Sequence, residues 1–115
     1  MEVETAVKKV LGLSPSVRVA TVCDMNGRLV FTARRKAVKN MLTRAESTDS
    51  LRTSAKNMAK RRKLARHLGK CKYTLAEYDK IKRIVVPAGR NHIMFVTCSP
   101  GYDHSKIVRK VRTFR

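Results

Sequence analysis

Residues 17–34 read VRVATVCDMNGRLVFTAR, a pattern of strand, tight turn and strand. The first half is rich in β-branched residues, which are typical of strands, and the second half is then expected to be its paired strand. Asp24-Met25-Asn26-Gly27 is predicted to form the turn between them, where Asn26-Gly27 supplies the positive φ that a tight hairpin needs. The stretch therefore predicts an antiparallel hairpin made of strands 17–25 and 28–34.

Helices are predicted on both sides of this hairpin. Apolar residues recur at helical spacing within residues 2–12, which predicts a short amphipathic helix. A longer helix is expected over residues 47–68, with Ser47 or Thr48 as its N-cap residue. The connecting segment, residues 36–46, fits at most one further helical turn.

Three more strands and a last helix complete the chain. The strands are expected at residues 72–78, 82–87 and 92–98, where short β-branched runs are bounded by turn residues. Asp103 or Ser105 can cap the final helix, which is basic toward the C-terminus. The predicted order is α-β-β-α-β-β-β-α, which assigns the chain to the α/β (α+β) class.

The composition is strongly basic. Twenty-seven Lys and Arg residues against eight Asp and Glu residues give a formal net charge of +19. A hydrophobic fraction of 43% is ordinary for a folded protein, so residues 1–115 are expected to form one domain rather than a disordered basic arm. Such a surface attracts a polyanion, and nucleic acid and an anionic membrane surface are the first candidates.

The sequence indicates a cytoplasmic, reducing compartment. No apolar stretch reaches the ~20 residues of a spanning helix, and the N-terminus lacks the order of a signal peptide. Cys23, Cys71 and Cys98 lie far apart in the chain, which fits reduced thiols better than disulfides.

The clearest functional pattern lies on the long predicted helix. Lys56, Lys60, Lys63, His67 and Lys70 are spaced 4, 3, 4 and 3 residues apart, which aligns them along one helical face. No acidic residue interrupts this basic row. Soluble helices usually mix charges of both signs, so the row favours contact with phosphate groups over a merely solvated face.

Further basic residues flank the row on the helix. Others lie in three separate regions, which are the segment from the hairpin to Arg44, the loop before residue 92 and the C-terminus. Cations at a helix C-terminus also favour the helix dipole, so part of the last group has a structural explanation. The predicted nucleic-acid-binding residues are Arg34, Arg35, Lys36, Lys39, Arg52, Lys56, Lys60, Arg61, Lys63, Arg66, His67, Lys70, Arg90, Lys106, Arg109, Lys110, Arg112 and Arg115.

Arg62 is expected to have a structural role instead. Its spacing from Leu51 and Met58 places it near the apolar side of the long helix. There it can reach the surface by its long side chain or form an ion pair with Asp24 or Glu77, and we favour the ion pair.

Residues that could support catalysis or bind a cofactor are not arranged for either role. Asp103, His104 and Ser105 are adjacent in one segment, so their side chains cannot converge as a catalytic triad requires. The His and Cys residues lack metal-ligand spacing, and no glycine-rich nucleotide motif occurs. No enzyme activity, no metal and no cofactor is expected. Tyr73 and Tyr78 alternate with apolar residues in a strand, which predicts core positions.

Three strings resemble an uncharacterised archaeal family associated with ammonia-oxidising archaea. They are VRVATVCDMNGRLV at residues 17–30, LGKCKYTLAEYDKIKRIVVP at 68–87 and NHIMFVTCSPGYDHSKIV at 91–108. The family has a roadblock/longin-like topology, so the resemblance implies a single five-stranded antiparallel sheet flanked by helices over nearly the whole chain. Roadblock-like domains are non-catalytic modules that dimerise and bind regulators, often small GTPases. This implies either a homodimer or a roadblock-type heterodimer.

The chain is unusually basic for a member of that family. Ala88-Gly89-Arg90 stands in a loop that usually carries acidic residues, and the segment 99–102 is also less acidic than expected. The exchange of acid for base indicates that this copy serves a polyanion instead of the inherited partner.

Three functions are consistent with these observations. The first is a non-catalytic RNA-binding protein of a ribonucleoprotein such as the archaeal ribosome, with rRNA and ribosomal proteins as partners. The second is a DNA-binding or chromatin protein that uses the same phosphate contacts. The third is a roadblock-type dimerisation or regulatory module whose basic surface binds an acidic protein partner. The charge and its spread over several faces favour the first.

Overall fold

The computed structural model describes all residues from 1 to 115, and its elements follow the predicted order. The elements are α1 (Val3–Leu11), β1 (Val17–Asp24), β2 (Leu29–Arg34), α2 (Arg44–Leu68), β3 (Thr74–Glu77), β4 (Lys82–Ala88), β5 (His92–Cys98) and α3 (Ser105–Val111). The predicted α/β (α+β) class, with one five-stranded antiparallel sheet flanked by helices, is confirmed.

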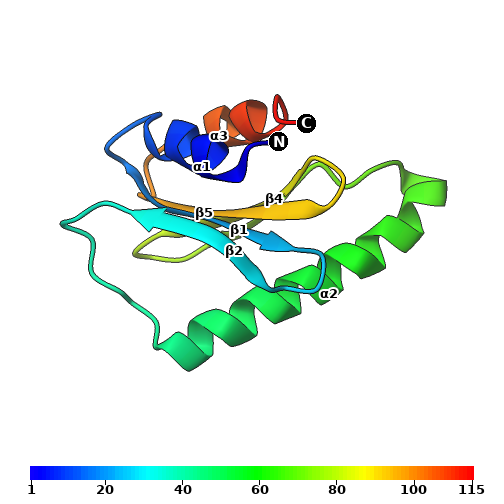
Figure 1. Ribbon diagram of the computed structural model, residues 1–115, viewed down its shortest axis with the longest axis horizontal. Helices are drawn as coiled ribbons and strands as arrows, with labels where there is room; N and C mark the ends of the chain where they lie inside the picture. Colours follow the sequence, from blue (N-terminus) through cyan, green and yellow to red (C-terminus); the bar gives the residue numbers. More distant parts are fainter.

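The sheet separates two unequal helical layers. Its strand order is β2-β1-β5-β4-β3, so β2 and β3 form the two edges. Figure 1 shows α1 and α3 side by side on one face and the long α2 crossing the other. The two termini meet on the α1–α3 side of the molecule.

The larger part of the core lies between the sheet and the α1–α3 layer. Val7 and Val10 of α1 and Ile107 of α3 are fully buried there against residues of the inner strands such as Val22 and Ile84. Burial of each such side chain stabilises the fold by about 1.5–3 kcal/mol. This layer therefore anchors the sheet.

Contact between α2 and the sheet is thinner. The helix buries only Ala55 and Met58, which pack against Cys23, Ile93 and Phe95. Twenty-five residues give a helix about 37 Å long, so most of its surface stays exposed. Leu51 and Ala65, on the same side of the helix, are half-buried, which agrees with the apolar side that the spacing of Leu51 and Met58 predicts.

The hairpin turn brings β1 and β2 against α2. Of the Asn-Gly pair, only Gly27 has a positive φ (+82), and Asp24 Oδ1 accepts hydrogen bonds from the N–H groups of Asn26 (2.8 Å) and Arg28 (3.0 Å). A Cβ atom on Gly27 would lie 2.9 Å from Arg52 Cα of α2. The absent side chain lets the turn rest directly on the helix backbone.

The long helix begins earlier than predicted, so the assignment of Ser47 or Thr48 as its cap is wrong. Thr43 is the N-cap residue: its side chain accepts from the Glu46 N–H at 3.1 Å, and the Glu46 carboxylate accepts from the Thr43 N–H at 2.9 Å. This reciprocal capping box satisfies two N–H groups that the helix end leaves free. Because of this capping box, the helix begins at Arg44, within the segment 36–46 that was expected to be mainly a connection.

Tyr73 and Tyr78 are also placed differently from the prediction. Both lie just outside β3 and are exposed, at 37% and 56%. β3 is only four residues long and lies at an edge, so it has too little sheet around it to bury them.

Candidate interaction surface

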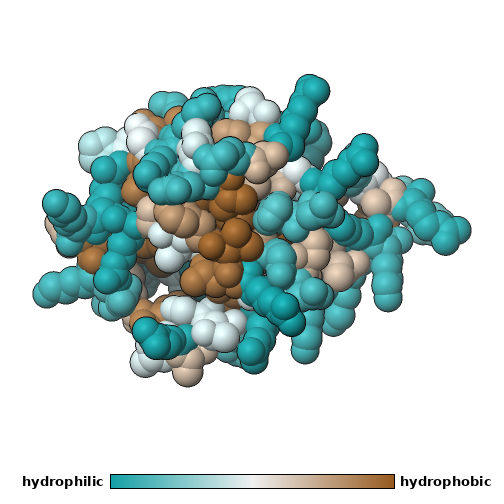
Figure 2. Space-filling model, in the orientation of Figure 1, coloured by the Kyte–Doolittle hydropathy of each residue, from teal (hydrophilic) through white to brown (hydrophobic).

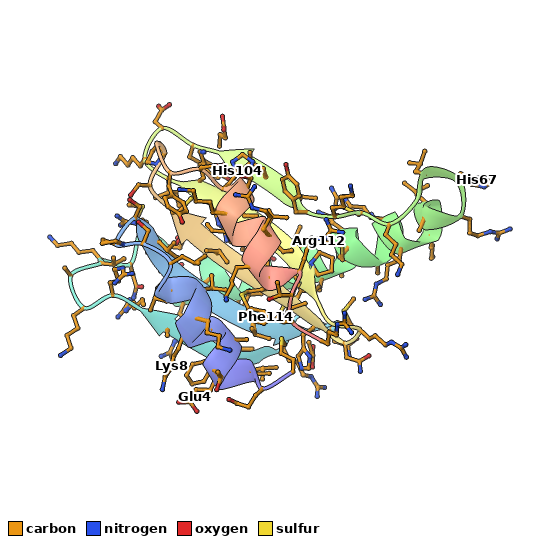
Figure 3. All side chains as sticks on the ribbon, turned by 90° about the horizontal axis from the view of Figure 1, so that it is seen from above. Glu4, Lys8, His67, His104, Arg112 and Phe114 are labelled. Carbon is orange, nitrogen blue, oxygen red and sulfur yellow. The ribbon has the colours of Figure 1, made fainter.

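The basic row on α2 is exposed along its length. Lys56, Lys60, Lys63 and His67 are all exposed, and Lys70 follows the end of the helix. Figure 3 shows His67 near the end of α2 that lies far from α1 and α3. Because the helix uses its opposite side to cover the sheet, it presents the row to solvent, as the spacing predicts.

Three further arginines among the predicted site residues lie on α2. Arg52 is exposed one turn before the row, beside the hairpin turn at Gly27. Arg66 is exposed and Arg61 is half-buried. The helix thus brings together the largest group of predicted site residues.

Arg35, predicted as a nucleic-acid contact, is engaged inside the protein. Its guanidinium donates hydrogen bonds to the carbonyl oxygens of Val17 (2.8 Å), Ser14 (2.6 Å) and Leu11. These bonds join the end of β2 to the loop after α1 and to the start of β1. Arg35 therefore stabilises the fold rather than contacting a partner.

The other cations after the hairpin remain at the surface. Arg34 donates to the side-chain oxygen of Asn40, and Lys36, Lys39 and Arg44 are exposed. They form a basic segment between β2 and α2, separate from the row on the helix.

The C-terminal cations lie on the opposite side of the sheet. Lys106, Arg109 and Lys110 line a shallow depression together with Leu13 and Tyr102. The Lys106 ammonium lies 5.9 Å from the centre of the Tyr102 ring, within the range of a cation–π contact. This basic group is separated from the α2 row by the sheet.

Arg90 and Arg115 come from distant parts of the sequence but line one depression at the β4–β5 turn. Arg112 is the C-cap residue of α3, three residues before Arg115, and it is exposed. The predicted residues thus form several surfaces rather than one.

The predicted ion pair of Arg62 is wrong. Its guanidinium donates a hydrogen bond to the Arg90 carbonyl at 2.9 Å, and no carboxylate lies within 4 Å of it. Asp24 is occupied by the N–H groups of its own turn, and Arg62 sits under the β4–β5 turn instead.

Half of the eight acidic residues bind backbone N–H groups instead of cations. They are Glu2, Asp24, Glu46 and Asp103. The pKa of each carboxyl lies below its usual value because of hydrogen bonds donated mainly by Thr5, Arg28, Thr43 and Ser105, respectively. The one ion pair in the protein joins Lys8 and Glu4 of α1 at 3.0 Å, and Figure 3 shows these two side chains close together.

The side chains that could take part in catalysis or bind a metal are held in structural roles. Asp103 Oδ1 accepts from the N–H (3.0 Å) and the hydroxyl (2.7 Å) of Ser105 at the start of α3, while His104 Nδ1 faces Lys82 Nζ at 3.3 Å. Nowhere do three metal-ligating side chains gather. Burial raises the pKa of the Cys23 thiol to about 11 and also raises the pKa of Cys98. Both thiols are therefore protonated at neutral pH.

Sequence reasoning missed an exposed apolar strip on β2. Leu29 and Val30 expose 57% and 46% of their surface, and no residue of this strand is buried. The signal in the sequence was the run Leu29-Val30-Phe31, which has three consecutive apolar residues where a half-buried strand would alternate.

Topology and layers together define a roadblock/LC7 fold. Similar solved structures include gliding protein MglB from Thermus thermophilus (TM-score 0.76, 13% identity, covering 96% of this chain and 80% of that chain). A roadblock/LC7 domain from Streptomyces avermitilis matches with TM-score 0.71 and 12% identity, over 95% of this chain and 88% of that one. An MglB structure described as having a tetrameric arrangement matches with TM-score 0.76 and 14% identity, over 96% and 79%. At these identities the likeness establishes the fold.

Comparison of the sequence with known families and proteins does not assign this chain to a family. No protein-family model matches the chain, and no curated protein matches it. The roadblock-like part of the predicted resemblance is confirmed by the solved structures, while its archaeal part stays a prediction. Nowhere does a helix combine the length and the apolar character that a bilayer span requires.

The classification as an RNA-binding or ribosomal protein is wrong. The matching structures are roadblock/LC7 proteins such as MglB and MglC, not ribosomal or RNA-binding proteins. Net charge indicates only that a surface attracts a polyanion, and an acidic polypeptide meets that condition as well as a phosphate backbone does. The charge alone could not make this distinction.

Proposed function

We propose that this chain is a non-catalytic, roadblock-type regulatory module that binds an acidic protein through the basic surface centred on α2. One domain over residues 1–115 and a cytoplasmic location belong to this proposal. The roadblock/LC7 fold supports a protein-binding module as the class of function. The charge of the surface supports an acidic partner.

The observation that carries the proposal is the lack of acidic partners for the cations within the fold. The chain has 27 Lys and Arg residues and a single ion pair, between Lys8 and Glu4. Neutralising these cations within the fold would need nearby acids, but there are only eight and half of them accept hydrogen bonds from backbone N–H groups. The positive charge on α2 is therefore not neutralised within the protein and can attract another molecule. Complementary charge makes such binding specific and speeds association.

Dimerisation is a second candidate, favoured by the open edge at β3. This strand pairs only with β4, so its other side can pair with another chain. The mass of the protein in solution, measured by light scattering after gel filtration, tests this candidate. A mass of twice the monomer value supports it, and a monomer at all concentrations contradicts it.

Affinity capture from a native extract treated with nuclease tests the acidic-partner proposal. We expect a protein of net negative charge to be retained in stoichiometric amount and to be released at high salt, because screening weakens contacts between exposed charges. A variant with Lys56→Glu, Lys60→Glu and Lys63→Glu should lose that protein. A variant with Lys106→Glu, Arg109→Glu and Lys110→Glu, which removes as much charge on the other side of the sheet, should keep it.

Loss of all captured protein after nuclease treatment would contradict the proposal. So would equal loss in both variants, since that would show attraction to the total charge rather than to a surface on α2.

A further inference from the structure

Strand β2 forms one edge of the sheet, and its outer side is free. It pairs with β1 alone. The Arg35 N–H bonds to the Arg18 carbonyl, so by the alternation of an antiparallel ladder the N–H groups of Thr32 and Arg34 point away from β1. An edge with free N–H and carbonyl groups is a template for another strand.

The apolar side chains of β2 are unusually exposed for such an edge. Figure 2 shows a hydrophobic area near the middle of the face on which β2 lies toward the viewer in Figure 1, surrounded by hydrophilic side chains. Leu29 and Val30 are the strongly exposed apolar residues of this strand. Proteins usually protect edges by making them short, by placing Pro or Lys in them, or by a β-bulge. β2 has no Pro or Lys, and its register against β1 shifts once, opposite Val22 and Cys23. β3, at the other edge, has four residues, whereas β2 has six.

Cations stand at both ends of this apolar strip. At the hairpin turn, Arg28 precedes β2 and Gly27 rests against Arg52 of α2, with Lys56 one helical turn further along. Arg34 is exposed at the other end of the strand. The one acid of the turn, Asp24, accepts hydrogen bonds from backbone N–H groups. The edge therefore combines free main-chain groups, apolar contact area and unpaired positive charge.

We propose that β2 accepts an extended acidic segment of another protein as a sixth strand of the sheet. This rests on the proposed function and gives the location and the form of the contact. The added main chain pairs with the free groups of β2, its apolar side chains cover Leu29 and Val30, and its carboxylates meet Arg28, Arg34 and Arg52. Strand addition obtains affinity from the main chain and selectivity from alternate side chains.

A second copy of this chain does not fit this edge. Two β2 strands side by side would place the same cations opposite one another, and like charges across a strand pair are destabilising. Charge complementarity therefore selects a different, acidic chain.

A synthetic peptide of about 12 residues that alternates Val and Glu is a suitable probe, since its length exceeds that of a typical strand. Its binding to the full chain is measured by fluorescence anisotropy of an end label. We expect N-methylation of every second residue, on the side that pairs with β2, to weaken binding by about tenfold or more, because it removes the donors that pair with the strand. A peptide with Lys in place of Glu should not bind.

Matched protein variants locate the contact. Leu29→Ser with Val30→Ser should weaken peptide binding about tenfold. Leu64→Ser with Leu68→Ser, at α2 positions that are exposed at 52% and 78%, should change it less than about twofold. Arg52→Glu with Lys56→Glu should weaken it more strongly than Lys106→Glu with Arg109→Glu, which removes the same charge elsewhere. If a β2 variant fails to fold, the N-methylated peptide still tests main-chain pairing with β2, because that experiment uses the unchanged protein.

Equal binding of the N-methylated and unmodified peptides would overturn the proposal. An RNA oligonucleotide that displaces the peptide, and whose own binding needs Arg52 and Lys56 but not Leu29 and Val30, would overturn it in favour of nucleic acid. If the protein captured from nuclease-treated extract is still bound by the Leu29→Ser, Val30→Ser variant, the β2 location fails while the proposed function stands. If neither that protein nor the peptide binds the wild-type chain, both fail.

Discussion

Gly27 sets how closely the hairpin turn approaches α2. Replacement by Ala forces a side chain into φ +82 and brings its Cβ to 2.9 Å from Arg52 Cα, a backbone atom that no rotamer change can move. We expect Gly27→Ala to lower the free energy of unfolding by about 2 kcal/mol or more, measured by urea denaturation. Gly69→Ala is the matched control, because Gly69 also has φ +82 but has no atom within 4 Å of the added Cβ. Equal effects of the two changes would show that the close approach to α2 does not matter.

Arg35 contributes to stability through three carbonyl oxygens. Arg35→Ala leaves the acceptors of Leu11, Ser14 and Val17 without this donor, so we expect a loss of about 1–3 kcal/mol in the free energy of unfolding. Lys36→Ala, at the exposed neighbouring position, should change stability by less than about 0.5 kcal/mol. A destabilised Lys36→Ala with an unchanged Arg35→Ala would reverse this assignment.

The sequence could not distinguish Arg35 from its neighbours. Arg34, Arg35 and Lys36 are three cations in a row, and the roles differ only because Arg35 meets carbonyls up to 24 residues away in the chain. The basic row on α2 was predictable for the opposite reason, since helical spacing alone places Lys56, Lys60 and Lys63 on one side.

Among the secondary-structure elements, the start of α2 depends on the capping box of Thr43 and Glu46. The pKa of Glu46 lies below its ordinary value, chiefly because the Thr43 N–H donates to it. The folded state therefore binds fewer protons than the unfolded chain near the ordinary pKa. The resulting stability is complete above that pKa and is lost as the pH falls through the lowered, folded value.

We expect the melting temperature to fall as the pH is lowered from about 5 to about 2, with Asp24 and Asp103 contributing in the same direction. Glu46→Gln should reduce this fall by slightly lowering the stability at neutral pH, because Gln also completes a capping box but lacks the negative charge of the carboxylate. Thermal melts followed by circular dichroism measure both. A Glu46→Gln profile identical to that of the wild-type protein would contradict the role of the carboxylate.

The elements themselves were largely predictable, and the first turn of α2 was not. Strands such as β1 and β5 follow from local β-branched patterns, and their order limits the sheet to few arrangements. The Thr43–Glu46 pair is present in the sequence, but the basic segment around it lacks apolar periodicity and so resembles a connection. The position of β2 at an edge follows only from the strand order, although the run Leu29-Val30-Phe31 indicates its apolar character.

For the protein as a whole, unpaired positive charge opposes folding. A net charge of +19 with a single ion pair means that most charge contacts are repulsive. Raising the salt concentration from about 0.01 to about 0.15 M shortens the screening length from about 30 to about 8 Å. We expect the melting temperature to rise by about 5 °C, which corresponds to roughly 1 kcal/mol. A melting temperature that falls with salt would show net attraction instead.

The function depends on what meets the cations of α2, and zero-length cross-linking tests this most directly. A carbodiimide joins a Lys amine to a carboxylate only when the two groups are in contact. In nuclease-treated native extract, we predict cross-links from Lys56, Lys60 or Lys63 to Asp or Glu residues of another protein, and their absence when those three lysines are replaced by Glu. Cross-links confined to other lysines, or a binding partner that disappears with nuclease, would contradict a protein-binding role for this surface.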